Sequence, residues 1–420
     1  MLSAEAKAVR GARRRRLWPL ALVLAAMGPG LMVMLADTDA GSIITAAQSG
    51  ARFGYSMVLP LVLLIPVLFL VQEMTVRLGL ATGRGHGALI RERFGYGWAG
   101  VSVGTLFLSS VGALVTEFSG VAGVGLLFGV PAWLSVSVAT VLLIALGVGG
   151  SYRRVERVGI AVGLLELLFL PAALLAHPDP AALVAGLGSL PVTNAQYAFL
   201  VAANVGAVIM PWMVFYQQAA VVDKALKVRH LPQARWDTLL GAILTQLIMI
   251  AVVVATAATV GRTHPGASLT TVGQISRALA PIIGPNGARV VFGLGMLGAS
   301  FVAALVVSMA GAYGVGEALA LPHSLNDPPR QAPAFYAVYT LAHVGGAVLV
   351  LTNVGNLINV NVDVEVMNAM LLPIVLGLLL AVEAKALPAR WRMRGAHRWV
   401  AWIVSGVVMA FGIYVAVTVL

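Results

Sequence analysis

Two carboxylates, Asp37 and Asp39, lie near the far end of the first long apolar run, in MLADTDAGSIIT. A carboxylate at membrane depth is costly unless it faces a partner, an ion or a water-filled cavity. Ala40, Gly41 and Ser42 follow directly and favour a break in the helix, which would expose carbonyls and a helix end to a ligand. The two acids therefore predict a cation site. The alternative is that they lie at the membrane surface and cap helix ends.

A second break is expected in residues 204–212, which read NVGAVIMPW. Pro211 has no backbone N–H and clashes with the preceding turn, so it frees the carbonyl near Ala207. A proline kink alone is common in membrane helices, but this one opens the second half of the chain as the acidic break opens the first. Paired breaks of this kind predict a transporter made of two inverted repeats, with a central binding site.

Four further acids fall within apolar segments, namely Glu117, Glu166, Asp363 and Glu365. Acids at membrane depth indicate ion or proton pathways. Asp363 and Glu365 are two residues apart, roughly 200° around a helix, so they cannot both face one ion. Asp37 and Asp39 diverge in the same way on a regular helix, but a break there brings them together.

The composition indicates which elements must position these residues. Hydrophobic residues make up 60% of the 420 residues and charged residues 10%, so an all-α polytopic membrane protein is expected. The absence of cysteine excludes disulfides and thiolate metal sites. About eleven segments are long enough to span a bilayer. They lie near 17–38, 56–78, 98–127, 131–149, 157–176, 197–222, 236–260, 289–316, 333–351, 362–382 and 398–418.

The spans predict one transporter domain at 17–420, preceded by a basic segment at 1–16. Two inverted repeats are expected at about 17–176 and 197–382, with an extra helix at about 398–418. The basic start also resembles a signal peptide, but its apolar run continues to the acids without a clear cleavage site.

Basic residues predict the orientation. With the amino terminus in the cytoplasm, only four of the 27 Lys and Arg residues lie outside, namely Arg52, Arg262, Arg277 and Arg289. The net charge of +11 is spread over short loops, so it reports topology and does not indicate a nucleic-acid partner. A protein of the inner cell membrane, surrounded by lipid, is expected.

Several stretches, taken together, resemble the natural resistance-associated macrophage protein (Nramp) family of divalent-metal transporters. Their order and spacing match over spans 1 to 10. The matching stretches are GPG at 28–30, DAGS at 39–42, QSGARFGY at 48–55, RLGLATG at 77–83, IRERF at 90–94, TEF at 116–118, LLFGVP at 126–131 and AVIMP at 207–211.

This resemblance implies a LeuT-like fold, with a 5+5 inverted repeat and helices 1 and 6 broken around an ion. It suggests the Asp39 carboxylate, the Ala207 carbonyl and the Met210 thioether as ligands. A thioether favours manganese, iron or cadmium over calcium and magnesium, which prefer oxygen. The alternative for Met210 is ordinary apolar packing.

The chain departs from the family at four positions: Ala40 replaces a proline, Ser42 a ligating asparagine, Trp212 a histidine and Glu365 a glutamine. Ser42 is a weaker oxygen donor and Trp212 cannot titrate. Glu365 is expected to face the ion and Asp363 a polar interface. An extra acid and a lost amide make the site more anionic and better suited to a hard cation such as magnesium. The Nramp-related magnesium transporters are the obvious comparison, but they are expected to lack the methionine kept here at Met210.

The predicted function is secondary-active import of divalent metal, manganese slightly ahead of magnesium, by alternating access. The predicted metal ligands are Asp39, Ser42, Ala207, Met210, Glu365 and Asp37. Asp39 and Glu117 form the predicted proton pathway, since neighbouring buried acids share protons. The protein is expected to be a monomer without a cofactor, because the metal is its substrate.

Three other classes compete with this prediction. A LeuT-like carrier of a small organic cation or amino acid is the main alternative, and several acids beside Trp212 fit a small ion better than a zwitterion. A non-transporting sensor is another. An enzyme is not expected, because the seven histidines fall mostly in loops and form no catalytic or metal-ligand motif.

Overall fold

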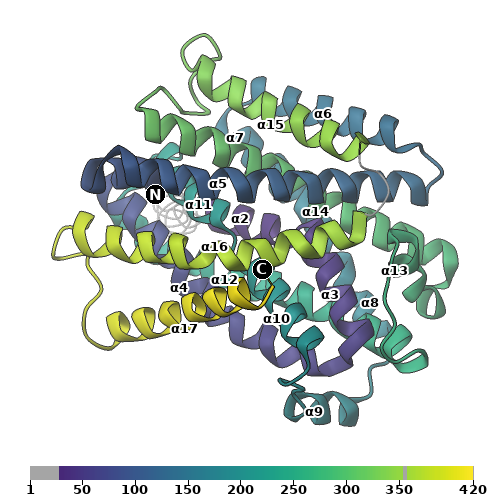
Figure 1. The fold of residues 1–420 in the computed structure, drawn as a ribbon. Coiled ribbons are helices and arrows are strands. Elements are labelled where there is room, and N and C mark those ends of the chain that lie inside the picture. Colours follow the sequence, from purple (N-terminus) through teal and green to yellow (C-terminus); the bar gives the residue numbers. More distant parts are fainter. Residues whose placement is uncertain (1–27, 353–356, 420) are drawn as a thin grey trace, which may run out of the picture.

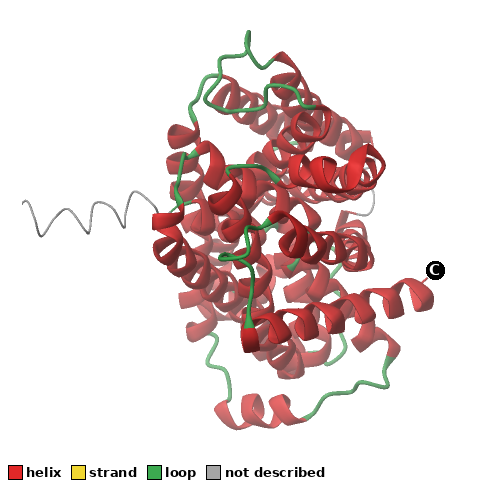
Figure 2. Cartoon of the chain, turned by 90° about the vertical axis from the view of Figure 1, so that its left-hand side faces the viewer, coloured by secondary structure: helices red, strands yellow, loops and turns green. Residues whose placement is uncertain are grey.

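A bundle of α-helices joined by short loops makes up the computed structural model, which describes residues 28–352 and 357–419 (Figures 1 and 2). Within those ranges there is no strand. Helices pair their own backbone groups, which a lipid environment requires. The predicted basic segment 1–16 lies outside the described residues.

The first half of the chain runs from the first broken helix to a surface helix. Its elements are α2 (Pro29–Asp37), α3 (Ala40–Phe53), η1 (Gly54–Met57), α4 (Val58–Thr82), α5 (His86–Leu127), α6 (Ala132–Val148), α7 (Tyr152–Gly163), η2 (Leu164–Leu168), α8 (Phe169–Leu175) and α9 (Pro180–Gly188).

The second half begins with the other broken helix. Its elements are α10 (Ala195–Val208), α11 (Pro211–Asp223), η3 (Val228–His230), α12 (Leu231–Thr256), the π-helical turn η4 (Ala257–Gly261), α13 (Val272–Ala278), α14 (Ala280–Leu319), α15 (Pro333–Thr352), α16 (Leu357–Ala386) and α17 (Gly395–Val419).

Nine helical stretches in the described ranges are long and apolar enough to cross a membrane, and α6 is a shorter apolar helix. The count is lower than the predicted eleven for two reasons. The first predicted span, 17–38, is described only from residue 28, where α2 is too short to count, and α6 falls below the length of a full span.

The first predicted span was incomplete. Helix α2 ends at Asp37, close to the predicted end at residue 38, but the chain continues after the break as α3 to Phe53, which the prediction placed in no span. The break itself lies at Thr38 and Asp39, just before the Ala40–Ser42 stretch expected to form it. Polar residues of α3, such as Gln48 and Ser49, lower its hydropathy and explain the early end in the prediction.

The second break agrees with the prediction from Pro211. Helix α10 ends at Val208, Ile209 and Met210 are extended, and α11 begins at Pro211. Proline at the first helical position needs no N–H and has a preset φ, so it starts α11 where it ends α10.

Helix α16 packs closely across both breaks, because it contacts α3 and α10. The approach is tightest at Gly206, where a methyl group would collide with the backbone carbonyl of Glu365. On the other side, α12 packs against α2 and α3, and α5 lies along α14 (Figure 1). The breaks therefore lie at the centre of the bundle.

Candidate functional site

Asp39 forms the start of α3. Its backbone is extended, and Oδ1 accepts a hydrogen bond from the Ser42 N–H at 2.7 Å, which caps the helix. The side chain is fully buried, and Oδ2 has no hydrogen-bond partner within the described ranges. One oxygen therefore holds the helix start, and the other is open to a ligand.

Ser42 connects the two helix breaks. Its hydroxyl lies 2.9 Å from the carbonyl oxygen of Asp37 and 3.2 Å from that of Ala207. Since a hydroxyl has one proton, it donates to one of these carbonyls at a time. The freed carbonyl of Ala207 and the end of α2 therefore meet at a single side chain beside Asp39.

Met210 lies in the extended segment of the second break and is fully buried. Its sulfur accepts a hydrogen bond from the Trp212 indole N–H at 3.0 Å. Trp212 is also fully buried. The indole thus orients the thioether, and the second lone pair of the sulfur remains for another partner.

Glu365 on α16 faces the first break. Its Oε2 accepts a hydrogen bond from Asn368 at 3.1 Å, and Asn368 accepts one from Ser109 at 2.8 Å. Oε1 has no partner among the described residues. A methyl group on Gly41 would collide with this oxygen and would lie 3.4 Å from Asp39 Oδ1, so both carboxylates border the same glycine. Asp363, two residues away, is exposed.

Asp37 and Glu117 lie on either side of this centre. Asp37 Oδ2 accepts a hydrogen bond from Thr245 at 3.4 Å, whereas its Oδ1 has no partner in the described part of the chain. Glu117 accepts hydrogen bonds from the Ala40 N–H at 3.2 Å and from the neighbouring Thr116 hydroxyl at 3.1 Å. The bond to the Ala40 N–H places the Glu117 carboxylate beside the residue that follows Asp39.

Two buried acids away from the breaks, Glu73 and Glu317, have partners that explain them. Glu73 pairs with Arg77 and, at 2.7 Å, with Arg235, so two basic side chains neutralise it. Glu317 accepts a hydrogen bond from the Gly87 N–H at 2.8 Å. These contacts separate structural acids from the acids at the breaks, which keep open oxygens.

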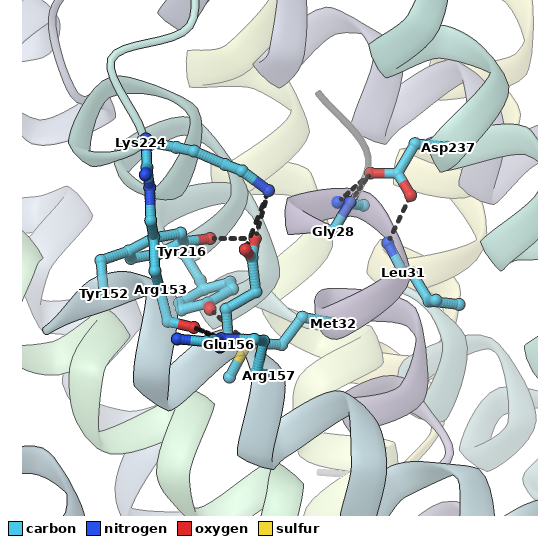
Figure 3. A network of polar contacts seen from close by, with 11 residues as sticks. Gly28, Leu31, Met32, Tyr152, Arg153, Glu156, Arg157, Tyr216, Lys224 and Asp237 are labelled. Carbon is cyan, nitrogen blue, oxygen red and sulfur yellow. Dashed lines mark hydrogen bonds and ion pairs between the residues drawn. The ribbon is translucent and has the colours of Figure 1, made fainter. Parts of the chain in front are cut away.

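A polar network stabilises the start of α2 (Figure 3). Asp237 accepts hydrogen bonds from the backbone N–H groups of Gly28, Gly30 and Leu31, at 3.0, 2.8 and 3.2 Å. Beside it, Lys224 forms a buried ion pair with Glu156, whose carboxylate is 2.8 Å away. Asp237 on α12 therefore supplies acceptors to a helix end that would otherwise carry unpaired donors.

The sequence predicted six metal ligands around the two helix breaks. Five of them lie at the breaks, and Glu365 faces the breaks from α16. Thr245 and Asn368 were not among the predicted residues. Asn368 lies three residues after Glu365, on the same helix face, which is a signal in the sequence. Thr245 contacts Asp37 from a helix 208 residues away, and no local pattern indicates that contact. Within residues 28–352 and 357–419, no three His, Asp or Glu side chains form a compact chelating group.

A family model described as natural resistance-associated macrophage protein-like (Nramp) matches residues 30–418. The chain belongs to the Nramp family. The match covers both broken helices and α16, so every candidate ligand lies within the Nramp region.

Among its relatives, this Nramp chain is 30% identical over 301 residues to the divalent metal cation transporter MntH 1 of Pseudomonas aeruginosa. The alignment covers 67% of this chain and 66% of that protein. It is 28% identical over 317 residues to MntH of Chromohalobacter salexigens, covering 73% of this chain and 72% of the relative.

Solved structures confirm the expected LeuT-like fold. The Eremococcus coleocola manganese transporter superposes with a TM-score of 0.74 at 17% identity, covering 93% of this Nramp chain and 86% of that one. MhsT in complex with L-phenylalanine superposes with a TM-score of 0.59 at 12% identity, covering 94% and 98% of the two chains. At these identities the likeness supports the fold alone.

Proposed function

We propose that this protein imports divalent metal ions by alternating access and that manganese is preferred slightly over magnesium. The observation that carries the proposal is the pair of buried carboxylates, Asp39 and Glu365, that border Gly41 and that each keep one oxygen without a partner among the described residues. Two buried negative charges without a basic partner are costly, and a divalent cation removes that cost. The names of the relatives, divalent metal cation transporters, support the same function.

The proposed ligands have complementary roles. Asp39 and Glu365 supply charge, the Ala207 carbonyl supplies a neutral oxygen, and Met210 supplies a soft sulfur. Ser42 is proposed as a further oxygen ligand, because its hydroxyl lies between the two breaks. Asp37, held by Thr245 at the end of α2, is proposed as an outer acid that attracts the ion.

Uptake by reconstituted protein tests this function. In liposomes that enclose a metal-sensitive dye, we expect saturable entry of manganese and magnesium, with cadmium also accepted and calcium weaker. The same vesicles are offered amino acids and choline. Entry of one of these organic substrates without any metal entry would support the organic carrier and contradict our proposal.

Met210 tests why manganese should be preferred. Met210→Leu keeps most of the side-chain volume and removes the sulfur, so manganese and cadmium affinities should fall while magnesium entry is kept or improves. Competition assays with each metal measure the change. Equal losses for all metals would show that Met210 only packs, and Met57→Leu in η1, past the far end of α3, controls for a buried methionine away from the breaks.

We further propose that the protein acts as a monomer in the inner membrane, with its amino terminus in the cytoplasm. Release of the metal ion to the cytoplasm then requires movement of α2. The network around Asp237 then holds the inner side closed (Figure 3). It lies at the end of the bundle where Lys224 and other basic residues gather, which positive-inside topology places in the cytoplasm.

Removing the Asp237 acceptors should favour the inward-open state. For Asp237→Ala, a loss of about 1–2 kcal/mol of helix-end stabilisation shifts the population roughly 5- to 30-fold. Because the chain has no cysteine, Met32→Cys on α2 gives a single reporter whose labelling rate by a maleimide should rise by that factor. Asp179→Ala, which removes the cap of α9, should leave the rate unchanged, and an unchanged rate in Asp237→Ala would contradict the role of α2.

A further inference from the structure

Glu166 is a buried acid that the proposed metal site does not use. It lies in η2, a 3₁₀ turn between α7 and α8, and its side chain is fully buried. Neither carboxylate oxygen makes a hydrogen bond of good geometry to any described residue. Such turns in the middle of a membrane helix often mark functional positions, and Pro171 explains this one because it cannot bond to the carbonyl of Leu167.

Helix packing places Glu166 beside the first helix break. Along α7, a methyl group on Gly159 would lie 2.7 Å from Met32, and one on Gly163 would lie 3.0 Å from Leu35. Helix α7 therefore packs along α2 in register, with Gly159 beside Met32 and Gly163 beside Leu35. Continuing by one turn on both helices places Glu166 beside Thr38. The packing therefore brings the Thr38 hydroxyl to the side of the first break that faces Glu166.

A chain of hydroxyls links Glu166 to the metal site without making it part of that site. The hydroxyls of Thr38 and Thr245 are 2.6 Å apart, and Thr245 in turn donates to Asp37 at 3.4 Å. Either hydroxyl of this pair can be the donor, so Thr38 is free to donate its one proton elsewhere only when it accepts from Thr245.

The charged residues of the break that Glu166 faces are acids. Asp37 and Asp39 flank Thr38, so their charges repel a charge on Glu166. Residues 295–302 of α14 and 242–256 of α12, on helices that contact η2 or α8, contain no titratable side chain. In the described part of the molecule, no ion pair joins Glu166 to a basic residue.

We propose that Glu166 and Thr38 form a second cation site, which takes a small monovalent cation, either a proton or a sodium ion. One carboxylate and a neighbouring hydroxyl match a single positive charge, whereas calcium requires roughly six to eight oxygens. The proposal rests on the transport function, because the monovalent cation is the partner of the metal in the transport cycle.

Binding at one site lowers the affinity of the other site by electrostatic repulsion. A metal ion bound to Asp39 makes the electrostatic potential at Glu166 less negative, so Glu166 binds the monovalent cation more weakly. By linkage, a cation on Glu166 weakens metal binding by the same factor. For one linked proton or sodium ion, the metal affinity falls by up to about tenfold for each tenfold rise in that ion.

Metal binding by the whole purified protein tests the inference. Manganese affinity is measured by calorimetry in one series of increasing proton concentration without sodium, and in another of increasing sodium at constant pH. We expect one of the two series to weaken binding in the wild type, and Glu166→Gln to reduce that dependence, with about one fewer proton released per metal if the ion is a proton. The responding series identifies the ion.

Two further variants complete the test. Glu166→Asp keeps the charge and should keep the dependence, while Glu92→Gln removes an exposed carboxylate and should match the wild type. If Glu166→Gln does not fold, Thr38→Val removes the hydroxyl and should weaken the dependence. The inference is overturned if manganese binds but neither series changes, or if the Glu166 variants respond as the wild type does. Absence of manganese binding by the wild type would instead contradict the proposed function.

Discussion

Asp39→Asn should abolish divalent-metal uptake while leaving α3 folded. Asparagine is as good a helix cap as aspartate, so it can still accept the Ser42 N–H, but it carries no charge to offset dehydration of the ion. We expect uptake to fall by more than the roughly 10- to 100-fold that loss of an outer partner costs a metal site. Initial rates of radioactive manganese entry into liposomes measure the loss.

Asp363→Asn is the matched control for this substitution. It makes the same chemical change in the same protein, but its side chain is exposed on α16. Its uptake should equal that of the wild type. Normal manganese entry by Asp39→Asn would remove Asp39 from the site and would contradict the ligand set built around it.

Glu365→Gln should give the second largest effect. At a distance of about 4 Å and an effective dielectric near 20, one charge attracts another by about 4 kcal/mol, which is ample to change metal selectivity. If Glu365 is a direct ligand, magnesium should lose more affinity than manganese. If it instead exchanges protons, the affinities should stay similar and the pH dependence of uptake should be lost. Uptake measured for both metals over a pH series distinguishes the roles.

Gly41→Ala checks the same contact from the opposite side. Its methyl group would collide with Glu365 Oε1, so the carboxylate must move and metal affinity should fall. Gly97→Ala is the control, because no atom lies within 4 Å of the added methyl group. If both Glu365→Gln and Gly41→Ala behave as the wild type does, Glu365 lies outside the ion pathway.

The sequence could predict the features that depend on local chemistry. Pro211 predicted the second break at the correct place, because a proline cannot continue the helix before it. The apolar segments predicted the membrane bundle, and the motif order predicted the family. The spacing of Asp363 and Glu365 predicted that they face opposite ways, and one is exposed while the other is buried.

Features that depend on distant segments could not be predicted in this way. Helix α3 was left out of the predicted spans, because its polar residues look unsuited to lipid until their partners on α10 and elsewhere are known. The hydrogen bond from Asn204 to Ser49 is one such contact. The Ser42 contact with the Ala207 carbonyl joins residues 165 positions apart. Glu166 was recognised as an intramembrane acid, but its neighbour Thr38 follows only from the packing of α7 on α2.

The close approach at Gly41 also has an evolutionary consequence. The space that a side chain at position 41 would occupy is already taken by the carboxylate of Glu365, so the two positions divide one fixed volume. A larger residue at position 41 becomes tolerable only after a shorter side chain has replaced Glu365. If the larger residue came first, it would collide with the Glu365 carboxylate. Aligned relatives should therefore show covariation between these positions, with glycine at 41 wherever a long acid stands at 365.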